Sequence, residues 1–273
     1  MSIKIWDSGP ANSETLVFFH GFPDDASMWN LQVAYLEKKY RCIRPDLPNF
    51  GDSIDDPAGF SFDTVVDKLN RALNQHKPAL PEKFTLVVHD WGAIYGYIFA
   101  QKFSNRINRI VALDIGASIK MQPNPLGYFL IPAYQLGLAS AFIATKIPAV
   151  GVALAGAATT ATLTGLSLFG NEYAGPTRRT PMSPYLNYPY YYFWKDAMAG
   201  KLKMEYDLPG VPFMFAYGTQ GVKKWMMFHD EEWLKRIQSE KQNRVVAFEQ
   251  SGHWLMRDEP GKLNREIEAF LET

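Results

Sequence analysis

The sequence is short of the residues that build disulfides and metal centres. Its 273 residues contain a single cysteine, Cys42. One cysteine can form neither an internal disulfide nor a zinc cluster of several cysteines, so we expect a reducing compartment, the cytoplasm. Any imidazole chemistry must use one of five histidines, which are His20, His76, His89, His229 and His253.

Net charge is missing as well, because 28 Lys+Arg balance 28 Asp+Glu. This balance argues against broad electrostatic attraction to nucleic acid or anionic lipid, so we expect no nucleic-acid partner. The first ten residues, MSIKIWDSGP, lack the apolar stretch of a signal peptide, which favours the same compartment. Hydrophobic residues make up 47% of the chain, which excludes disorder and favours a large core.

Charged residues are absent from one long stretch. No Asp, Glu, Lys or Arg lies between Lys146 and Glu172, a length that reaches the threshold for a membrane span. Pro148, several glycines and many threonines lower its hydropathy, and no basic cluster flanks it on one side. We therefore expect a buried or substrate-facing helix here, with membrane contact by residues 147–170 as the less favoured alternative.

Short apolar runs alternate with helical patterns along the rest of the chain. Residues 15–20, 84–90 and 109–115 are predicted strands, and residues 27–40 and 61–77 are predicted helices. Such alternation is typical of an α/β protein with a mostly parallel sheet and helices on both faces.

This alternation stops in the middle of the chain and then resumes. No clear strand pattern lies within residues 117–206, whereas residues 211–218 and 244–250 are again predicted strands. We therefore predict a core made of residues 1–116 and 207–273, with residues 117–206 inserted as a helical cap. Such an insertion is well placed to cover the carboxyl ends of the strands, where open α/β sheets bind ligands.

A strand-to-helix junction carries the strongest chemical signal. In Val88–Gly92 the small Gly92 permits the sharp turn of a nucleophile elbow, although Val88 is larger than the usual glycine. The central residue is Asp90. A carboxylate can displace a leaving group at an sp3 carbon and form an alkyl ester, a reaction suited to epoxides and alkyl halides.

Hydrolysis of that ester needs a base and an oxyanion hole. We predict His253 as the base, because it follows the last strand in a glycine-containing loop near the C-terminus. The backbone N–H groups of Phe22 and Trp91 are the predicted oxyanion donors. Phe22 lies in the turn His20–Pro23, and we assign His20 to the same oxyanion and substrate-binding loop.

These residues together resemble the α/β-hydrolase superfamily and, within it, the epoxide hydrolases. The resemblance runs through HGFPDDASMW, DLPNFGDS, VVHDWGA, the helical insertion and SGHW, in that order along nearly the whole chain. It implies an α/β-hydrolase fold, an aspartate nucleophile, a small hydrophobic epoxide as substrate and a vicinal diol as product. It implies no metal and no organic cofactor.

The resemblance also implies two cap tyrosines that donate hydrogen bonds to the epoxide oxygen. Tyr134, which is followed by glutamine as in the family, is the first candidate. The second lies in Asn187–Tyr192, where spacing favours Tyr191 and leaves Tyr190 close behind. The alternative for each tyrosine is aromatic packing of the cap on the core.

The third member of the catalytic triad departs from the family pattern. The usual acid position, in Tyr217–Gly221, holds no carboxylate, and the next acid, Asp230, is explained by a helix start. Asp114 ends an apolar strand, where a carboxylate is costly to bury without a partner, so we predict Asp114 as the acid. Its alternative is a solvated strand end or a hinge contact.

Two other functions stay open at this stage. A haloalkane dehalogenase would use the same nucleophile, but Phe22 replaces the asparagine that usually holds the halide. A catalytically silent ligand-binding protein on the same fold is favoured by the missing acid at Gly221. The sequence carries no signal for the oligomeric state.

Overall fold

The structure, a computed structural model, describes residues 3–53, 55–120, 125–168, 183–220 and 227–273. Within these residues seven strands form one sheet in the order β1-β3-β2-β4-β5-β6-β7. The strands are β1 (Ile5–Ser8), β2 (Thr15–Phe19), β3 (Arg41–Pro45), β4 (Phe84–His89), β5 (Ile107–Leu113), β6 (Phe213–Gly218) and β7 (Arg244–Phe248). β1 pairs antiparallel with β3 and the other neighbours pair in parallel, which confirms the predicted fold class.

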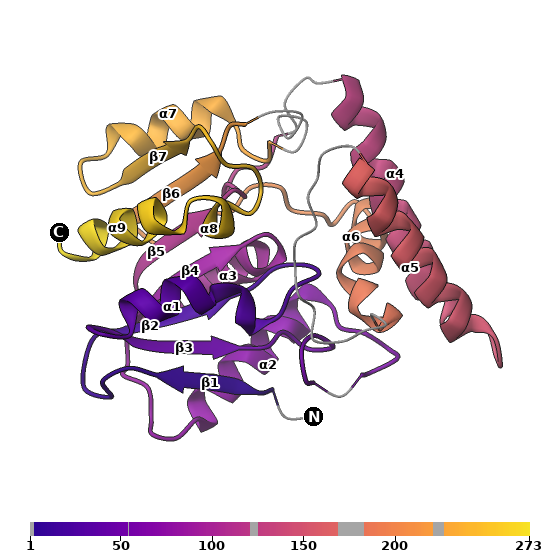
Figure 1. Cartoon of the computed structure of the whole chain (residues 1–273), viewed down its shortest axis with the longest axis horizontal. Helices are drawn as coiled ribbons and strands as arrows, with labels where there is room; N and C mark the ends of the chain where they lie inside the picture. The colour runs from indigo at the N-terminus through magenta and orange to yellow at the C-terminus, as the bar shows by residue number, and fades with distance from the viewer. Residues whose placement is uncertain (1–2, 54, 121–124, 169–182, 221–226) are drawn as a thin grey trace.

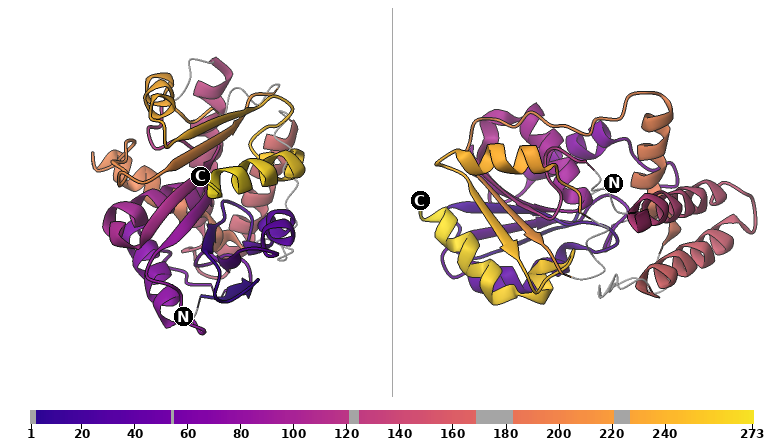
Figure 2. Two further views of the ribbon diagram at one scale, coloured as in Figure 1. Left: turned by 90° about the vertical axis from the view of Figure 1, so that its left-hand side faces the viewer. Right: turned by 90° about the horizontal axis from the view of Figure 1, so that it is seen from above.

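Helices cover both faces of this sheet (Figures 1 and 2). One face carries α2 (Phe62–Gln75), α3 (Trp91–Lys102) and α7 (Glu231–Ser239), and the other carries α1 (Asn30–Leu36), α8 (Leu255–Asp258) and α9 (Pro260–Leu271). Short 3-10 turns, η1 (Ala26–Trp29) and η2 (Ser104–Arg106), complete the core. Strand β2 shows why both faces of the sheet are covered by helices. Its side chains alternate between two buried clusters: Val17 and Phe19 pack in one, and Leu16 and Phe18 pack in the other.

The remaining helices lie between β5 and β6 in the chain. They are α4 (Pro125–Ala144), α5 (Gly151–Leu168), η3 (Pro184–Asn187) and α6 (Tyr188–Met198). Figure 1 shows them at the right, facing the carboxyl ends of the parallel strands. We call these helices the cap; the boundaries at residues 117 and 206 stay predictions.

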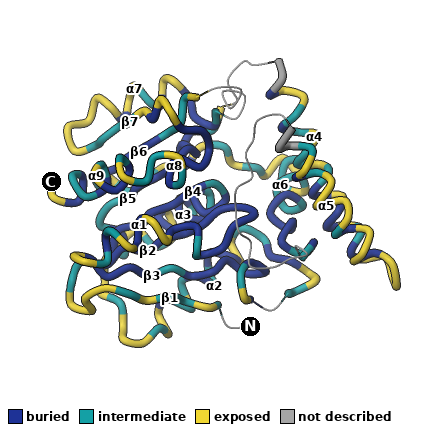
Figure 3. The backbone as a smooth tube through the Cα atoms, in the orientation of Figure 1, coloured by how far each residue is buried: buried dark blue, intermediate teal, exposed yellow. Residues whose placement is uncertain are grey.

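Helix α5 corrects the expectation for the uncharged run. It was expected to be buried or substrate-facing, but Val152, Leu154 and much of the helix surface beside them are exposed (Figure 3). None of the described α5 residues lines the cavity beneath the cap. Among the described helices, only α4 is long and apolar enough to cross a membrane: residues 127–144 have a mean hydropathy of 1.3, and 39% of them are buried.

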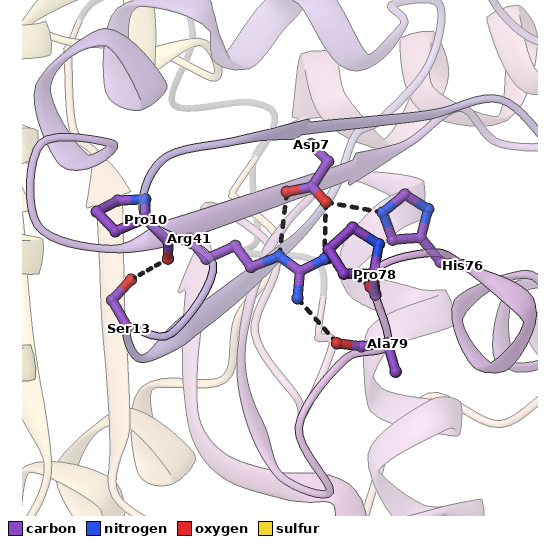
Figure 4. A network of polar contacts seen from close by, with 7 residues as sticks. All are labelled: Asp7, Pro10, Ser13, Arg41, His76, Pro78 and Ala79. Atoms are coloured by element: carbon purple, nitrogen blue, oxygen red, sulfur yellow. Dashed lines mark hydrogen bonds and ion pairs between the residues drawn. The ribbon is translucent and has the colours of Figure 1, made fainter.

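A buried arginine holds the other end of the sheet together (Figure 4). The Arg41 guanidinium, at the start of β3, donates to both carboxylate oxygens of Asp7 at 3.1 and 2.7 Å. It also donates to the carbonyls of Pro78 and Ala79, at 2.7 and 2.9 Å. Burial alone would raise the pKa of Asp7, but hydrogen bonds from Arg41 and His76 outweigh it and lower that pKa. This network ties edge strand β1 to the segment before β4, far from the cap.

Candidate active site

Asp90 stands at the sharp turn between β4 and α3. Its φ of 52° and ψ of −128° lie outside the regions that non-glycine residues usually adopt. Close neighbours explain two of the glycines around it. A Cβ at Gly21 would lie 2.3 Å from the Cβ of Asp90, and one at Gly92 would lie 2.3 Å from the carbonyl oxygen of Phe19. The strained turn therefore needs these glycines.

Val88, the departure from the usual elbow, has its own compensation in α3. A Cβ at Gly96 would lie 2.6 Å from Cγ1 of Val88, so the missing side chain at Gly96 makes room for the larger one at Val88. Val88 therefore fits at this turn because the facing residue in α3 is a glycine.

The Asp90 carboxylate is held by hydrogen bonds on one side. The N–H of Phe22 donates to Oδ1 of Asp90 at 2.7 Å, and the N–H of Trp91 also donates to this carboxylate. Burial would raise the pKa of Asp90, but the hydrogen bond and charge of His253 and the Trp91 N–H outweigh it and lower that pKa. Asp90 is therefore ionised at neutral pH.

His253 lies between two carboxylates. Its Nδ1 lies 2.6 Å from Oδ2 of Asp114, and its Nε2 lies 3.5 Å from Oδ2 of Asp90. Burial opposes protonation of the ring, but the hydrogen bonds and charges of Asp114 and Asp90 outweigh this and raise the pKa of His253. Asp114 is buried, and its other oxygen accepts a hydrogen bond from the N–H of Gly218 at 3.2 Å.

Asp114 and Asp90 meet because their strands end together. His89, the last residue of β4, is in register with Leu113, the last residue of β5. The two aspartates are the residues that directly follow these strand ends. The loop of His253 reaches them through another close approach. A Cβ at Gly218 would lie 2.3 Å from the carbonyl oxygen of Gly252, so only a glycine at the end of β6 leaves that space.

The alternative acid does not reach the ring. Asp230 caps α7, where its Oδ1 accepts a hydrogen bond from the N–H of Glu232 at 3.1 Å. Its Oδ2 lies 2.7 Å from Nζ of Lys120. The helix-start explanation of Asp230 is thus confirmed. Gly221, where the family acid is missing, lies outside the described residues.

His20 lies in the predicted oxyanion loop, and its ring supports that loop from within the core. Its ring is fully buried, with Nε2 accepting a hydrogen bond from the N–H of Leu47 at 2.8 Å and Nδ1 lying 3.0 Å from the carbonyl oxygen of Gly21. The ring does not line the cavity. His20 instead joins the Phe22 loop to the loop after β3, because a buried imidazole must satisfy both ring nitrogens.

Two sets of hydrogen bonds that hold the His253 loop were not predicted from the sequence. Nε2 of His89 lies 2.8 Å from the carbonyl oxygen of His253, and burial lowers the pKa of His89 to about 3, so a neutral ring donates this hydrogen bond. Asp24 accepts hydrogen bonds from Nε1 of Trp254 at 3.2 Å and from Arg257 at 2.6 Å. The only signals in the sequence were their positions beside motif residues.

A cavity of about 170 Å³ lies between the sheet and the cap, mostly lined by apolar side chains. Asp90 and Trp91 lie on its sheet side, and Tyr134 and Tyr190 lie on its cap side. The two tyrosine rings are 5.9 Å apart. Burial and the nearby Asp90 charge raise the pKa of both phenols, Tyr190 also through Tyr134, so both keep their protons and can donate hydrogen bonds.

Tyr191, which spacing favoured as the second cap donor, faces elsewhere. Its ring packs against that of Phe142 at 5.3 Å, and it does not line the cavity. Tyr190 lies over the site instead, with its ring 5.2 Å from that of Trp91. Consecutive residues of a helix point about 100° apart, so a shift of one position decides which tyrosine of α6 faces Asp90.

The cavity residues show no sign of a metal site. Among the described residues, no group of three or more His, Cys, Asp or Glu side chains is placed to hold a metal ion. The polar groups that face the reacting position are a carboxylate, an imidazole and phenols, which suit proton transfer and nucleophilic displacement.

Comparison with known proteins points to one family. The model of the alpha/beta hydrolase family matches residues 16–266. A cis-3-alkyl-4-alkyloxetan-2-one decarboxylase from Xanthomonas campestris is 27% identical over 300 residues, covering 100% of this chain and 93% of that protein. Epoxide hydrolase 2 from Caenorhabditis elegans is 32% identical over 124 residues, covering 45% of this chain and 32% of that protein.

A solved structure supports the fold over the full length. Bacillus megaterium epoxide hydrolase in complex with an inhibitor superposes with a TM-score of 0.72 at 16% identity, covering 99% of this chain and 97% of that chain. At that identity the likeness shows the fold and not the substrate.

Proposed function

Because the chain is a hydrolase that belongs to the alpha/beta hydrolase family, we propose that it opens epoxides to vicinal diols through a covalent ester on Asp90. The observation that carries the proposal is the arrangement of the Asp90 carboxylate. Oδ1 is held by the N–H of Phe22, while Oδ2 lies 3.5 Å from Nε2 of His253, beside the cavity. One oxygen is thus fixed and the other faces the space for substrate.

In the first step Oδ2 of Asp90 attacks an epoxide carbon from the side opposite to the breaking C–O bond. The electron pair of that bond goes to the epoxide oxygen, which takes a proton from a phenol. Tyr134 and Tyr190 are placed for this role, because they face Asp90 across the cavity and are protonated at neutral pH.

The second step follows from the loss of charge on Asp90. Once its carboxylate becomes an ester, one of the two anions beside His253 is gone and the pKa of the ring falls. The neutral imidazole, oriented by Asp114, takes a proton from water. The hydroxide adds to the ester carbon, and the negative charge develops on Oδ1, to which the N–H of Phe22 already donates, with the N–H of Trp91 as the second proposed donor. The bond between the ester carbon and Oδ2 then breaks, and Oδ2 leaves in the diol with the proton held by the His253 imidazolium. The proton of the new carboxyl group returns to the tyrosinate formed in the first step, which restores the Asp90 carboxylate.

The test is to trap the ester. The His253→Gln variant, mixed in excess with a reactive aryl epoxide, should gain the mass of one epoxide per chain, located on Asp90 by peptide mapping. The Asp90→Ala variant is the control and should gain nothing. If no adduct forms across a broad epoxide panel although the ligand still binds, the silent ligand-binding alternative replaces this proposal. Halide release from alkyl halides without diol formation would favour the dehalogenase alternative.

A second candidate reaction is decarboxylation of an oxetan-2-one. The extent of the alignment favours it. The decarboxylase relative aligns with this whole chain, cap included, whereas the epoxide hydrolase from Caenorhabditis elegans aligns with less than half of this chain. Asp90 could attack the sp3 ring carbon and release the ring carboxylate. Loss of carbon dioxide would then form the alkene and expel Asp90, without water. Alkene and carbon dioxide from an oxetan-2-one, with no diol from any epoxide, would favour this candidate.

A further inference from the structure

The outer surface of the cap is unusually apolar. Ten large hydrophobic side chains are markedly exposed among the described residues, and eight of them lie within residues 128–154. On α4, Phe129, Leu136 and Ile143 are 78%, 46% and 54% exposed. They recur every seventh residue and so form one stripe along the helix. A helix of a soluble protein normally turns such a stripe inward.

The stripe continues into the turn that follows α4. Ile147, Val150, Val152 and Leu154 are each about half exposed, from 47% to 56%. Figures 1 and 2 show α4 and α5 side by side as a hairpin, with this turn at the end farthest from the sheet, and Figure 3 shows that its surface is exposed. We call Phe129, Leu136, Ile143 and these four residues the hairpin face.

Charge is nearly absent from the stretch of sequence that carries the hairpin face. Residues 127–165 contain one charged residue, Lys146. Its Nζ donates a hydrogen bond to the carbonyl oxygen of Pro57, back toward the core. A large apolar surface with one charged residue marks an interaction site, and so little charge argues against a partner held by opposite charge.

We propose that the hairpin face inserts into the surface of a lipid membrane through apolar contact. A narrow stripe on a projecting hairpin (Figure 2) offers little area to a second protein surface, whereas fluid acyl chains close around it. The single cation suits a neutral lipid surface, because binding to anionic lipid gains from clustered Lys and Arg. The helix would lie in the interface and not cross the bilayer.

The opposite side of α4 connects the lipid contact to the candidate active site. Ile131 and Tyr134 line the cavity, so one helix separates the lipid surface from the site of Asp90. Apolar substrates concentrate in lipid. We therefore infer that the substrates are apolar molecules dissolved in a membrane, a statement that rests on the proposed function, whereas lipid binding does not.

Vesicle flotation tests the contact without any enzyme assay. The wild-type chain should float with phosphatidylcholine vesicles equally well at low and high salt, since apolar insertion is not screened. Phe129→Asp and Leu154→Asp should each weaken binding about tenfold, because a charge must enter the interface. Leu31→Asp is the matched control: Leu31 is 50% exposed on α1, outside the cap, and its loss should change nothing.

Three results would overturn the proposal. They are no flotation with phosphatidylcholine, flotation only with anionic vesicles and only at low salt, or a dimer in light scattering that Phe129→Asp breaks while vesicles stay unbound. Hydrolysis of a water-soluble epoxide should be the same in the hairpin variants as in wild type. If the chain floats with vesicles but hydrolyses no epoxide, the proposed function and the substrate inference are contradicted. The lipid contact is not.

Discussion

The sheet side and the cap side of the cavity are built by different means. On the sheet side, Asp90 and Asp114 follow paired strands and are held by backbone N–H groups of Phe22 and Gly218. On the cap side, Tyr190 is placed by the packing of its ring against aromatic neighbours. Backbone hydrogen bonds fix an atom more narrowly than ring packing does. We therefore expect substitutions on the sheet side to lower activity more than those on the cap side.

The largest effect is expected at the nucleophile. Asp90→Ala should lower kcat about 10⁴-fold or more, because no other carboxylate faces the reacting position from the described residues. Single-turnover kinetics with an aryl epoxide measures it, and circular dichroism checks the fold. Residual activity within about a hundredfold of wild type would contradict the expectation that the sheet side carries the larger effects.

The acid comes next. Asp114→Asn should lower kcat about 10³-fold to 10⁴-fold, because the amide cannot hold the His253 ring in the required tautomer. The matched control is Asp230→Asn, since asparagine also caps a helix and Asp230 does not contact the ring. Steady-state kinetics of both variants decides between the two acids. Equal losses, or a larger loss at Asp230, would contradict the assignment.

On the cap side, neighbouring tyrosines should differ. Tyr190→Phe should lower the rate of ester formation about tenfold to a hundredfold, because one donor to the epoxide oxygen is lost while Tyr134 remains. Tyr191→Phe should stay within about twofold of wild type, since its ring packs on Phe142. Rapid-mixing measurement of the alkylation step compares the pair. If Tyr191→Phe slows ester formation more than Tyr190→Phe does, Tyr191 is the second cap donor, as sequence spacing predicted.

The smallest effect is expected from a support residue. His89→Leu should slow hydrolysis of the ester about tenfold, because the hydrogen bond to the carbonyl of His253 is lost. Alkylation of Asp90 should keep its rate, since His253 is the residue displaced. His89→Gln, which can donate in the same place, should recover most of the loss. Equal slowing of both steps would show a general structural role instead.

The sequence predicted the sheet side better than the cap side. The strands are short apolar runs whose period and order are local properties, so the mostly parallel sheet could be predicted. The burial cost of a carboxylate pointed to Asp114, which the structure places 2.6 Å from His253. The roles of these residues in catalysis stay predictions until the variants are measured.

The cap expectations were weaker because they needed three-dimensional information. Choosing between Tyr190 and Tyr191 requires the rotation of α6 about its axis, which ring packing sets and spacing does not. The uncharged run was expected to be buried, but composition cannot tell which side of a helix faces water when both sides are apolar. The hydrogen bond of the buried His20 ring could not be predicted either, because its partner, the N–H of Leu47, is 27 residues away.

By itself the sequence determined the strand order along the chain, the strained turn that carries Asp90 and the set of residue types available for chemistry. These follow from local patterns, since a glycine, a buried strand or an acid at a strand end has the same meaning in any context. The tertiary structure alone decided which tyrosine enters the cavity and which apolar face is left to solvent. Those outcomes depend on how distant segments pack, and packing contacts are made between residues that no local pattern connects.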